Sequence, residues 1–303
     1  MKIIRFIYLL LLLTGLSSQA LLSQENELIY MAGDSLRKVI KEEFRVASYR
    51  DRGINVDEQE IIKLMDRMPS FGIYKDTYFV TGVPLNQQIT RNTADAVFQL
   101  SIRQRLTKSI LPFNSFLYLT YTQKAFWDIY RESSPFRDNN YNPGIGIGKY
   151  IIEKNQLRGG LLVAFEHESN GREDKESRSW NYISINGKYF INMLLSIGFK
   201  VWIPYVDGGE NKDLLEYRGL GTISFNAITG NRKWWITTEL TPRKGWGNIN
   251  TIVSIGYKPS EKLNQSFFLR FSDGVGESLL NYNKYSTNLR FGICIKPDFY
   301  SFL

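Results

Sequence analysis

The chain has 303 residues, a formal net charge of +8 and a single cysteine, Cys294. One cysteine excludes an intramolecular disulfide and a cysteine-based metal cluster, and we expect Cys294 to be a small apolar residue within a strand. The modest positive charge is compatible with an anionic membrane surface and gives no reason to expect nucleic acid as a partner. Aromatic residues make up 14% of the chain although the mean hydropathy is only −0.26, which suits strands with one apolar and one polar face.

The N-terminus has the pattern of a secretory signal peptide. Two basic residues precede an apolar run that ends at Leu13, and small residues follow. The run is too short for a membrane-spanning helix, so we expect an exported chain with a signal peptide over residues 1–23. Residues 24–70 are charged and helix-like, with the apolar residues of 57–68 on one helical face. We assign 24–70 to an N-terminal periplasmic extension.

Residues 71–303 consist of short runs of alternating character, separated by turn signals. The even number of runs and the mixture of short turns with long polar connections are typical of a membrane barrel. We therefore predict an all-β chain whose residues 71–303 form a transmembrane antiparallel β-barrel of about twelve strands; a soluble β-sandwich is the alternative. The expected strands are 73–81, 96–106, 116–127, 143–152, 160–167, 181–190, 193–205, 217–225, 233–240, 251–258, 266–273 and 286–295.

The stretch NPGIGIGKY (142–150) resembles a phosphate-binding loop. Pro143 stands at the first glycine position, however, and Tyr150 replaces the serine or threonine that contacts the metal. Alternate glycines on one face of a strand instead predict close packing inside a barrel. These glycines are Gly144, Gly146 and Gly148.

The stretch AFEHESNGREDKESRSWN (164–181) contains His167, the only histidine in the chain. Because residues i and i+2 of a strand share a face, His167 and Ser169 continue an apolar column that we expect to face lipid. A hairpin centred near Asp174 would place His167 opposite Asn181, Phe165 opposite Ile183 and Val163 opposite Ile185, so apolar residues would meet across the strands.

A serine, a histidine and an asparagine at the rim of a lipid-facing stripe predict nucleophilic catalysis. A serine hydroxyl becomes a nucleophile when an imidazole takes its proton, and the imidazole needs an acceptor that holds its tautomer. Ser169, His167 and Asn181 would fill these roles. The alternative is a polar loop that begins one residue early and holds an isolated histidine.

Several motifs resemble the outer-membrane phospholipase A family of Gram-negative bacteria, over roughly residue 72 to the end. The matching segments are YTQKAFW (121–127), ESSPFRDNNYNP (132–143), HESNGR (167–172) and SRSWN (177–181). The resemblance implies a twelve-stranded barrel in the bacterial outer membrane. It also implies calcium-dependent hydrolysis of acyl esters of glycerophospholipids, with phospholipase A1, A2 and lysophospholipase activity.

The resemblance also assigns roles to residues. Ser169 would be the nucleophile, His167 the base and Asn181 its orienting partner, and the backbone amide of Gly171 would stabilise the oxyanion. Calcium would lie beside the site at the interface of a homodimer, where Gln123 would also be buried. The implied calcium ligands are Ser133, the carbonyl oxygen of Arg172, Ser177 and, in a more distant loop, Glu210.

Membrane phospholipids are thus the expected substrate. The alternatives from other classes are a catalytically inactive outer-membrane barrel, acting as a pore or structural protein, and a soluble secreted esterase.

Overall fold

The computed structural model describes residues 57–297, apart from 193, 206–208, 261–262 and 264. The predicted signal peptide (1–23) and most of the predicted extension (24–70) lie outside the described residues. The chain divides into two compact units, and the described parts are 57–64 with 154–156 in the first and 65–153 with 157–297 in the second.

Helix α2 (Glu58–Arg67) confirms the helix predicted over 57–68. It has Glu58 and Glu60 in its first turn and Arg67 in its last, which complements the helix dipole. No helix among the described residues is long and apolar enough to cross a membrane.

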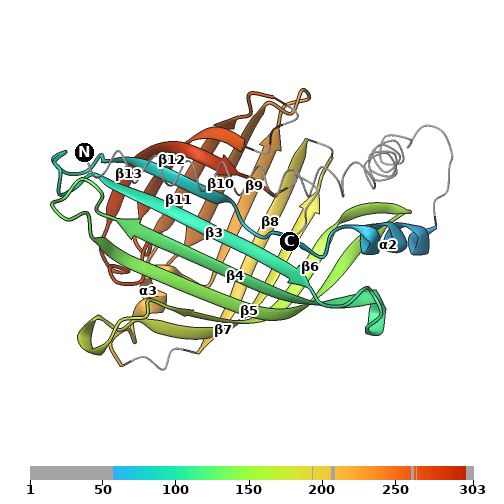
Figure 1. Cartoon of the computed structure of the whole chain (residues 1–303). Helices are drawn as coiled ribbons and strands as arrows, with labels where there is room; N and C mark the ends of the chain where they lie inside the picture. The colour runs from blue at the N-terminus through green and yellow to red at the C-terminus, as the bar shows by residue number, and fades with distance from the viewer. Residues whose placement is uncertain (1–56, 193, 206–208, 261–262, 264, 298–303) are drawn as a thin grey trace. The chain divides into compact units, whose positions relative to one another are not determined.

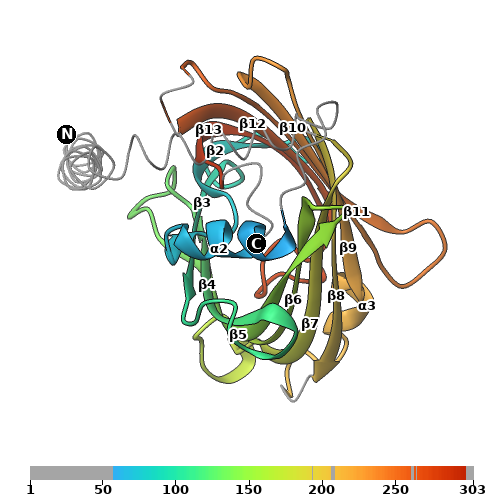
Figure 2. The same cartoon turned by 90° about the vertical axis from the view of Figure 1, so that its right-hand side faces the viewer.

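The second unit is an antiparallel sheet that closes on itself. Figure 2 shows the sheet curving round until β13 lies beside β2, and these two strands pair. The strands are β1 (Phe71–Ile73), β2 (Thr77–Pro84), β3 (Asp95–Arg105), β4 (Ser115–Trp127), β5 (Phe136–Glu153), β6 (Gln156–Ser169), β7 (Ser179–Phe190), β8 (Leu195–Tyr205), β9 (Gly221–Ile228), β10 (Trp234–Pro242), β11 (Ile249–Tyr257), β12 (Gln265–Gly274) and β13 (Ser286–Ile295).

Strands β1 and β2 share one place in this barrel, because both pair with β3, at different positions along it. The 13-stranded sheet therefore forms a barrel with twelve strand positions. From β2 to β13 each strand pairs with the next one in sequence, and β13 pairs with β2 to close the sheet. Figure 1 shows β3, β4 and β5 side by side. The closed sheet confirms the predicted barrel and excludes the β-sandwich.

The strand boundaries differ from the prediction at several places, and the predicted strand 73–81 is divided between β1 and β2. Strand β5 begins at Phe136 rather than at residue 143. The polar residues before Pro143 look like a loop in sequence, but Asp138, Asn140 and Asn142 are buried in a polar interior that allows the strand to continue. The strand predicted over 217–225 begins at Gly221, because helix α3 (Leu214–Arg218) takes the preceding residues.

The two faces of the sheet differ in polarity as expected. On β6, Val163 and Phe165 are exposed on the outer face, whereas Leu162, Ala164 and Glu166 are buried. The same alternation of an apolar exterior with a mixed interior is characteristic of membrane barrels. Cys294 is completely buried in an apolar cluster that includes Val80 and Phe268, as predicted for a small apolar residue.

The glycine column of β5 packs closely, as predicted. A Cβ atom on Gly146 would lie 2.6 Å from the Cβ atom of Ala164, and one on Gly148 would lie 2.3 Å from the Phe116 ring. Larger side chains at these positions would collide with the neighbouring strand or with this ring.

Connections at the two ends of the barrel differ in length. One end has turns such as 229–233, and the other has longer loops such as 170–178 and 275–285. The 275–285 loop folds onto the barrel interior, where Leu279 is fully buried. Leu279 belongs to a cluster with Trp180, Tyr182, Leu214 and Tyr282.

Candidate active site on the outer wall

The β6–β7 hairpin has the predicted register. His167 lies opposite Asn181, Phe165 opposite Ile183 and Val163 opposite Ile185. Because Phe165 and Ile183 are exposed on the outer face, His167 and Asn181 lie on the lipid-facing side of the sheet.

The imidazole of His167 interacts directly with Asn181. Nδ1 of the ring lies 2.8 Å from Oδ1 of Asn181. An amide oxygen only accepts hydrogen bonds, so this contact requires the proton on Nδ1 and leaves the lone pair on Nε2. The ring is therefore held in the tautomer that a general base needs. Ser169 ends β6 on the same face, opposite Ser179.

The loop after Ser169 is closed by Asn170. Its backbone amide donates to the carbonyl of Arg178 at 3.0 Å. Its side chain accepts from the amide of Arg178 at 2.9 Å and donates to the carbonyl of Glu176 at 2.8 Å. Asn170 is 4% exposed, so these bonds are protected from water and fix the conformation of the loop.

Gly171 follows in a conformation that other residues rarely adopt. Its φ angle is +65°, and a Cβ atom there would lie 3.1 Å from the Tyr141 ring. The positive φ angle therefore favours glycine at this position, and a Cβ atom would also require a small shift of the Tyr141 ring.

The inner face of the hairpin carries buried carboxylates. Glu166 accepts hydrogen bonds from Tyr182 at 2.9 Å and Ser184 at 2.5 Å, and pairs with Lys200 at 2.7 Å. These inward partners were not predicted from the sequence. Strand alternation indicates that Glu166 points inward, since it is next to an outward histidine, but not which side chains it meets there.

Glu168, the carboxylate on the other side of His167, is held in the same way. It accepts from the Trp180 indole at 2.9 Å and pairs with Arg218 at 2.7 Å. Both carboxylates beside His167 are therefore neutralised from within the barrel.

Two of the predicted calcium ligands lie on one loop. The side chain of Arg172 pairs with Glu176 and donates to the carbonyl of Arg137 at the start of β5. Ser177 is half-buried, and its backbone amide donates to Asp174 at 3.0 Å. Ser133 lies in the neighbouring β4–β5 loop with a φ angle of 63°. Within the described residues, no group of three or more His, Cys, Asp and Glu side chains could hold a metal.

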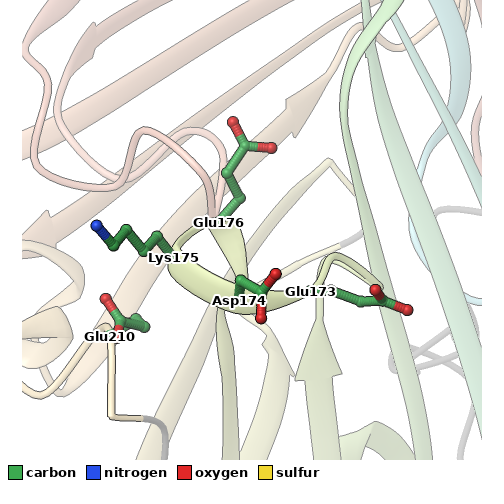
Figure 3. Close-up of a pocket in the computed structure, with 5 residues that line it drawn as sticks. All are labelled: Glu173, Asp174, Lys175, Glu176 and Glu210. Atoms are coloured by element: carbon green, nitrogen blue, oxygen red, sulfur yellow. The ribbon is translucent and has the colours of Figure 1, made fainter.

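Glu210 lies in an open pocket of the loop region. Figure 3 shows this residue approaching the 170–178 loop from a separate segment of the chain. The pocket has a volume of ≈ 730 Å³ and is lined by Glu173, Asp174, Lys175, Glu176 and Glu210. Four carboxylates and one ammonium group give it an acidic character. Glu210 is thus near the loop that carries Arg172 and Ser177.

Gln123 is a polar residue on the outer face of β4. It pairs with Leu100 of β3 on one side and with Tyr141 of β5 on the other. Its Oε1 atom accepts a hydrogen bond from the Tyr121 hydroxyl at 3.3 Å. The Tyr141 ring also lies 3.1 Å from where a Cβ atom on Gly171 would be, so Tyr141 lies between Gln123 and the candidate site.

Comparisons of the sequence with a family model and with known proteins all match phospholipases A1. The family model described as phospholipase A1 matches residues 75–295. The chain is similar to phospholipase A1 of Proteus vulgaris, with 28% identity over 218 residues covering 69% of this chain and 72% of that protein. It is 30% identical over 213 residues to phospholipase A1 of Klebsiella pneumoniae, covering 67% of this chain and 70% of the relative.

Solved structures show the same fold. The outer membrane phospholipase A from Escherichia coli matches with a TM-score of 0.68 and 23% identity, over 78% of this chain and 97% of that one. The Salmonella typhi outer membrane phospholipase dimer with bound calcium matches with a TM-score of 0.68 and 24% identity, over 80% and 99%.

The closed twelve-stranded sheet, with an apolar outer wall and a polar hairpin at its rim, defines an outer-membrane β-barrel with a candidate site facing lipid. The match over most of the chain is more specific, and the chain belongs to the phospholipase A1 family. The family resemblance found in the sequence is thereby confirmed.

Proposed function

We propose that this barrel hydrolyses acyl ester bonds of glycerophospholipids in the outer membrane, with Ser169 as nucleophile, His167 as base and Asn181 as its orienting partner. The expected activities are those of phospholipases A1 and A2 and of a lysophospholipase. The observation that carries the proposal is the 2.8 Å contact between His167 Nδ1 and Asn181 Oδ1 on the lipid-facing wall.

The reaction would begin with proton transfer from Ser169 to Nε2 of His167 as the serine oxygen attacks the ester carbonyl. Asn181 would stabilise the protonated imidazole through its Nδ1–H bond. The backbone N–H of Gly171 would donate to the carbonyl oxygen as it becomes an oxyanion. His167 would then protonate the leaving alcohol, and water activated by the same imidazole would release the fatty acid from the acyl-serine.

A neutral orienting residue is favourable at this position. A carboxylate at the lipid-facing wall would carry a desolvation penalty of several kcal/mol. The amide of Asn181 provides the same acceptor atom without a charge. The outward Phe165, Val163 and Ile183 would contact the acyl chains of a lipid whose ester reaches the rim.

We further propose a calcium ion beside the site, with Ser133, the carbonyl of Arg172 and Ser177 as ligands and Glu210 as a more distant acidic residue. These are oxygen donors, which suit a hard cation. The Salmonella typhi relative with bound calcium supports this assignment. When bound, the cation would supply positive charge that stabilises the oxyanion.

A homodimer would complete the surface for substrate. The relative from Salmonella typhi is a dimer, and Gln123 places an amide on the outer wall between Leu100 and Tyr141. An amide facing hydrocarbon is unfavourable unless both its oxygen and its NH2 group are paired, and the described bond from Tyr121 uses only the oxygen. We therefore propose that the NH2 group of Gln123 donates a hydrogen bond across the dimer interface. Two barrels side by side would also enclose the acyl chains between their walls.

The decisive measurement is fatty-acid release from mixed phospholipid–detergent micelles, with calcium and with a chelator, for wild type and Ser169→Ala. We expect release that requires both calcium and Ser169. Ser179→Ala is the matched control, because Ser179 lies directly opposite Ser169 in the β6–β7 ladder and should retain activity.

Folded wild-type protein that releases no fatty acid would contradict the proposal. That result would favour the inactive barrel, and conductance across a planar bilayer would then test for a pore.

A further inference from the structure

Three alternate residues of β5 point into the barrel and are almost fully buried. Asp138, Asn140 and Asn142 are 0%, 4% and 7% exposed. We refer to them as the β5 polar column. Burying three polar side chains in a row is unfavourable unless each has hydrogen-bond partners. The hydrogen-bond partners of these residues show which other segments the column holds in place.

The first two residues of the β5 polar column hold the 275–285 loop. The backbone amide of Leu279 donates to Oδ1 of Asn140 at 3.1 Å, and that of Leu280 donates to Oδ2 of Asp138 at 3.0 Å. Asn140 also donates to Asp138 at 2.7 Å. This end of β5 is therefore fixed to the 275–285 loop, which lies far from β5 in the sequence.

Asn142 has different partners, which belong to the β6–β7 hairpin. Its Nδ2 atom donates to the backbone carbonyl of His167 at 2.9 Å and to the Tyr182 hydroxyl at 3.1 Å. The Tyr182 hydroxyl in turn donates to Glu166 at 2.9 Å. Both N–H bonds of the Asn142 amide are used, and both partners adjoin the candidate site.

His167 is therefore held from two sides of the sheet. Asn181 fixes its ring on the outer face, and Asn142 fixes its main chain from the inner face. The main-chain position of a strand residue sets where its Cβ, and hence its ring, can lie. Displacements of about 1 Å in a catalytic group lower rates by up to about 100-fold.

We propose that Asn142 is a positioning residue for the ester hydrolysis, acting through the main chain of His167. This inference rests on the proposed function, since it assigns a role in the same site. Asn142 touches no reacting atom. It would keep the imidazole at the distance and angle at which Nδ1 meets Asn181 and Nε2 is available to Ser169.

The test uses two replacements of similar size, Asn142→Asp and Asn142→Leu. An ionised aspartate keeps the polarity but loses the N–H donors, and leucine loses both. We expect both variants to lower kcat about 10-fold with KM nearly unchanged, because substrate contacts remain. Asn226→Ala is the control; Asn226 of β9 accepts from buried Thr237 at 3.1 Å and has no described bond to the hairpin.

A second readout separates positioning from general stability and does not depend on hydrolysis. Because His167 is the only histidine, ¹⁵N-histidine labelling gives one pair of ring-nitrogen signals. We expect the wild type to show the Nδ1–H tautomer, and both Asn142 variants to show a mixture of tautomers. Asn226→Ala should keep the wild-type spectrum. Thermal unfolding in detergent would confirm that each variant is folded.

Wild-type kcat and an unchanged histidine spectrum in both Asn142 variants would overturn the inference. Activity that falls only in proportion to thermal stability, with an unchanged spectrum, would also overturn it. Inactive wild-type protein would instead contradict the proposed function, and the histidine spectra would still decide whether Asn142 positions the ring.

Discussion

Asn181 determines which nitrogen of His167 carries the proton. Its Oδ1 atom lies 2.8 Å from Nδ1, so removing it leaves the ring free to rotate and to change tautomer. We expect Asn181→Ala to lower kcat about 100-fold, within the usual range for positioned proton transfer, with a small effect on KM. Steady-state kinetics on mixed micelles would measure this. The control is Asn186→Ala, since Asn186 donates to Ser184, farther along β7. Equal kcat values for Asn181→Ala and wild type would exclude the orienting role.

Gly171 combines a backbone requirement with a proposed catalytic one. At a φ angle of +65°, an alanine costs about 1–2 kcal/mol, and its Cβ would meet the Tyr141 ring at 3.1 Å. We expect Gly171→Ala to reduce kcat strongly and to lower the thermal midpoint slightly. Gly230→Ala is the control, because a Cβ atom there meets nothing within 4 Å. A Gly171→Ala variant with wild-type kcat would show that the loop holds this backbone N–H in place without glycine, and would contradict the backbone requirement.

At the scale of secondary-structure elements, the β6–β7 hairpin depends on the loop that packs behind it. Leu279 is fully buried against Trp180 and Tyr182 of β7, although it belongs to the distant 275–285 loop. Trp180 and Tyr182 alternate with Asn181, so the apolar cluster supports the inner face of the same strand that carries the proposed orienting residue.

Truncating Leu279 should therefore destabilise this end of the barrel. Leu279→Ala creates a cavity, and large-to-small changes at buried sites cost about 2–5 kcal/mol. Urea unfolding in detergent would measure the loss. Leu220→Ala should change stability by less than about 0.5 kcal/mol, because Leu220 is 59% exposed. Equal stability of the two variants would show that the loop does not support the hairpin.

At the scale of the whole barrel, a network of ion pairs crosses the interior at the loop end. Arg290 of β13 pairs with Asp95 of β3 at 2.8 Å and with Glu277 at 2.9 Å. Glu277 also lies 3.7 Å from Lys124 of β4. Burial alone would raise the pKa of Glu277, but the positive charges of Arg290 and Lys124 outweigh burial and lower the pKa to about 2.

This pKa predicts how stability depends on pH. A carboxyl group whose pKa is lower in the folded state stabilises that state above the unfolded pKa, near 4.5, and loses the contribution as pH falls toward about 2. We expect the free energy of unfolding to decrease by about 3 kcal/mol over this interval. Glu277→Gln should lower stability at neutral pH and flatten the dependence. Parallel curves for wild type and Glu277→Gln in acid unfolding would contradict this prediction.

The sequence alone determined the barrel, the register of the β6–β7 hairpin and the pairing of His167 with Asn181. These features depend on a repeat of two residues along each strand and on one short loop, so neighbouring residues are sufficient to predict them. Only the tertiary structure decided which distant residues meet inside. The contact of Asn142 with His167 and the insertion of Leu279 behind Trp180 depend on how twelve strands stagger when the sheet closes. In a closed barrel, the total stagger is the sum of the register shifts between all neighbouring strands. No single segment of the sequence is sufficient to predict this total.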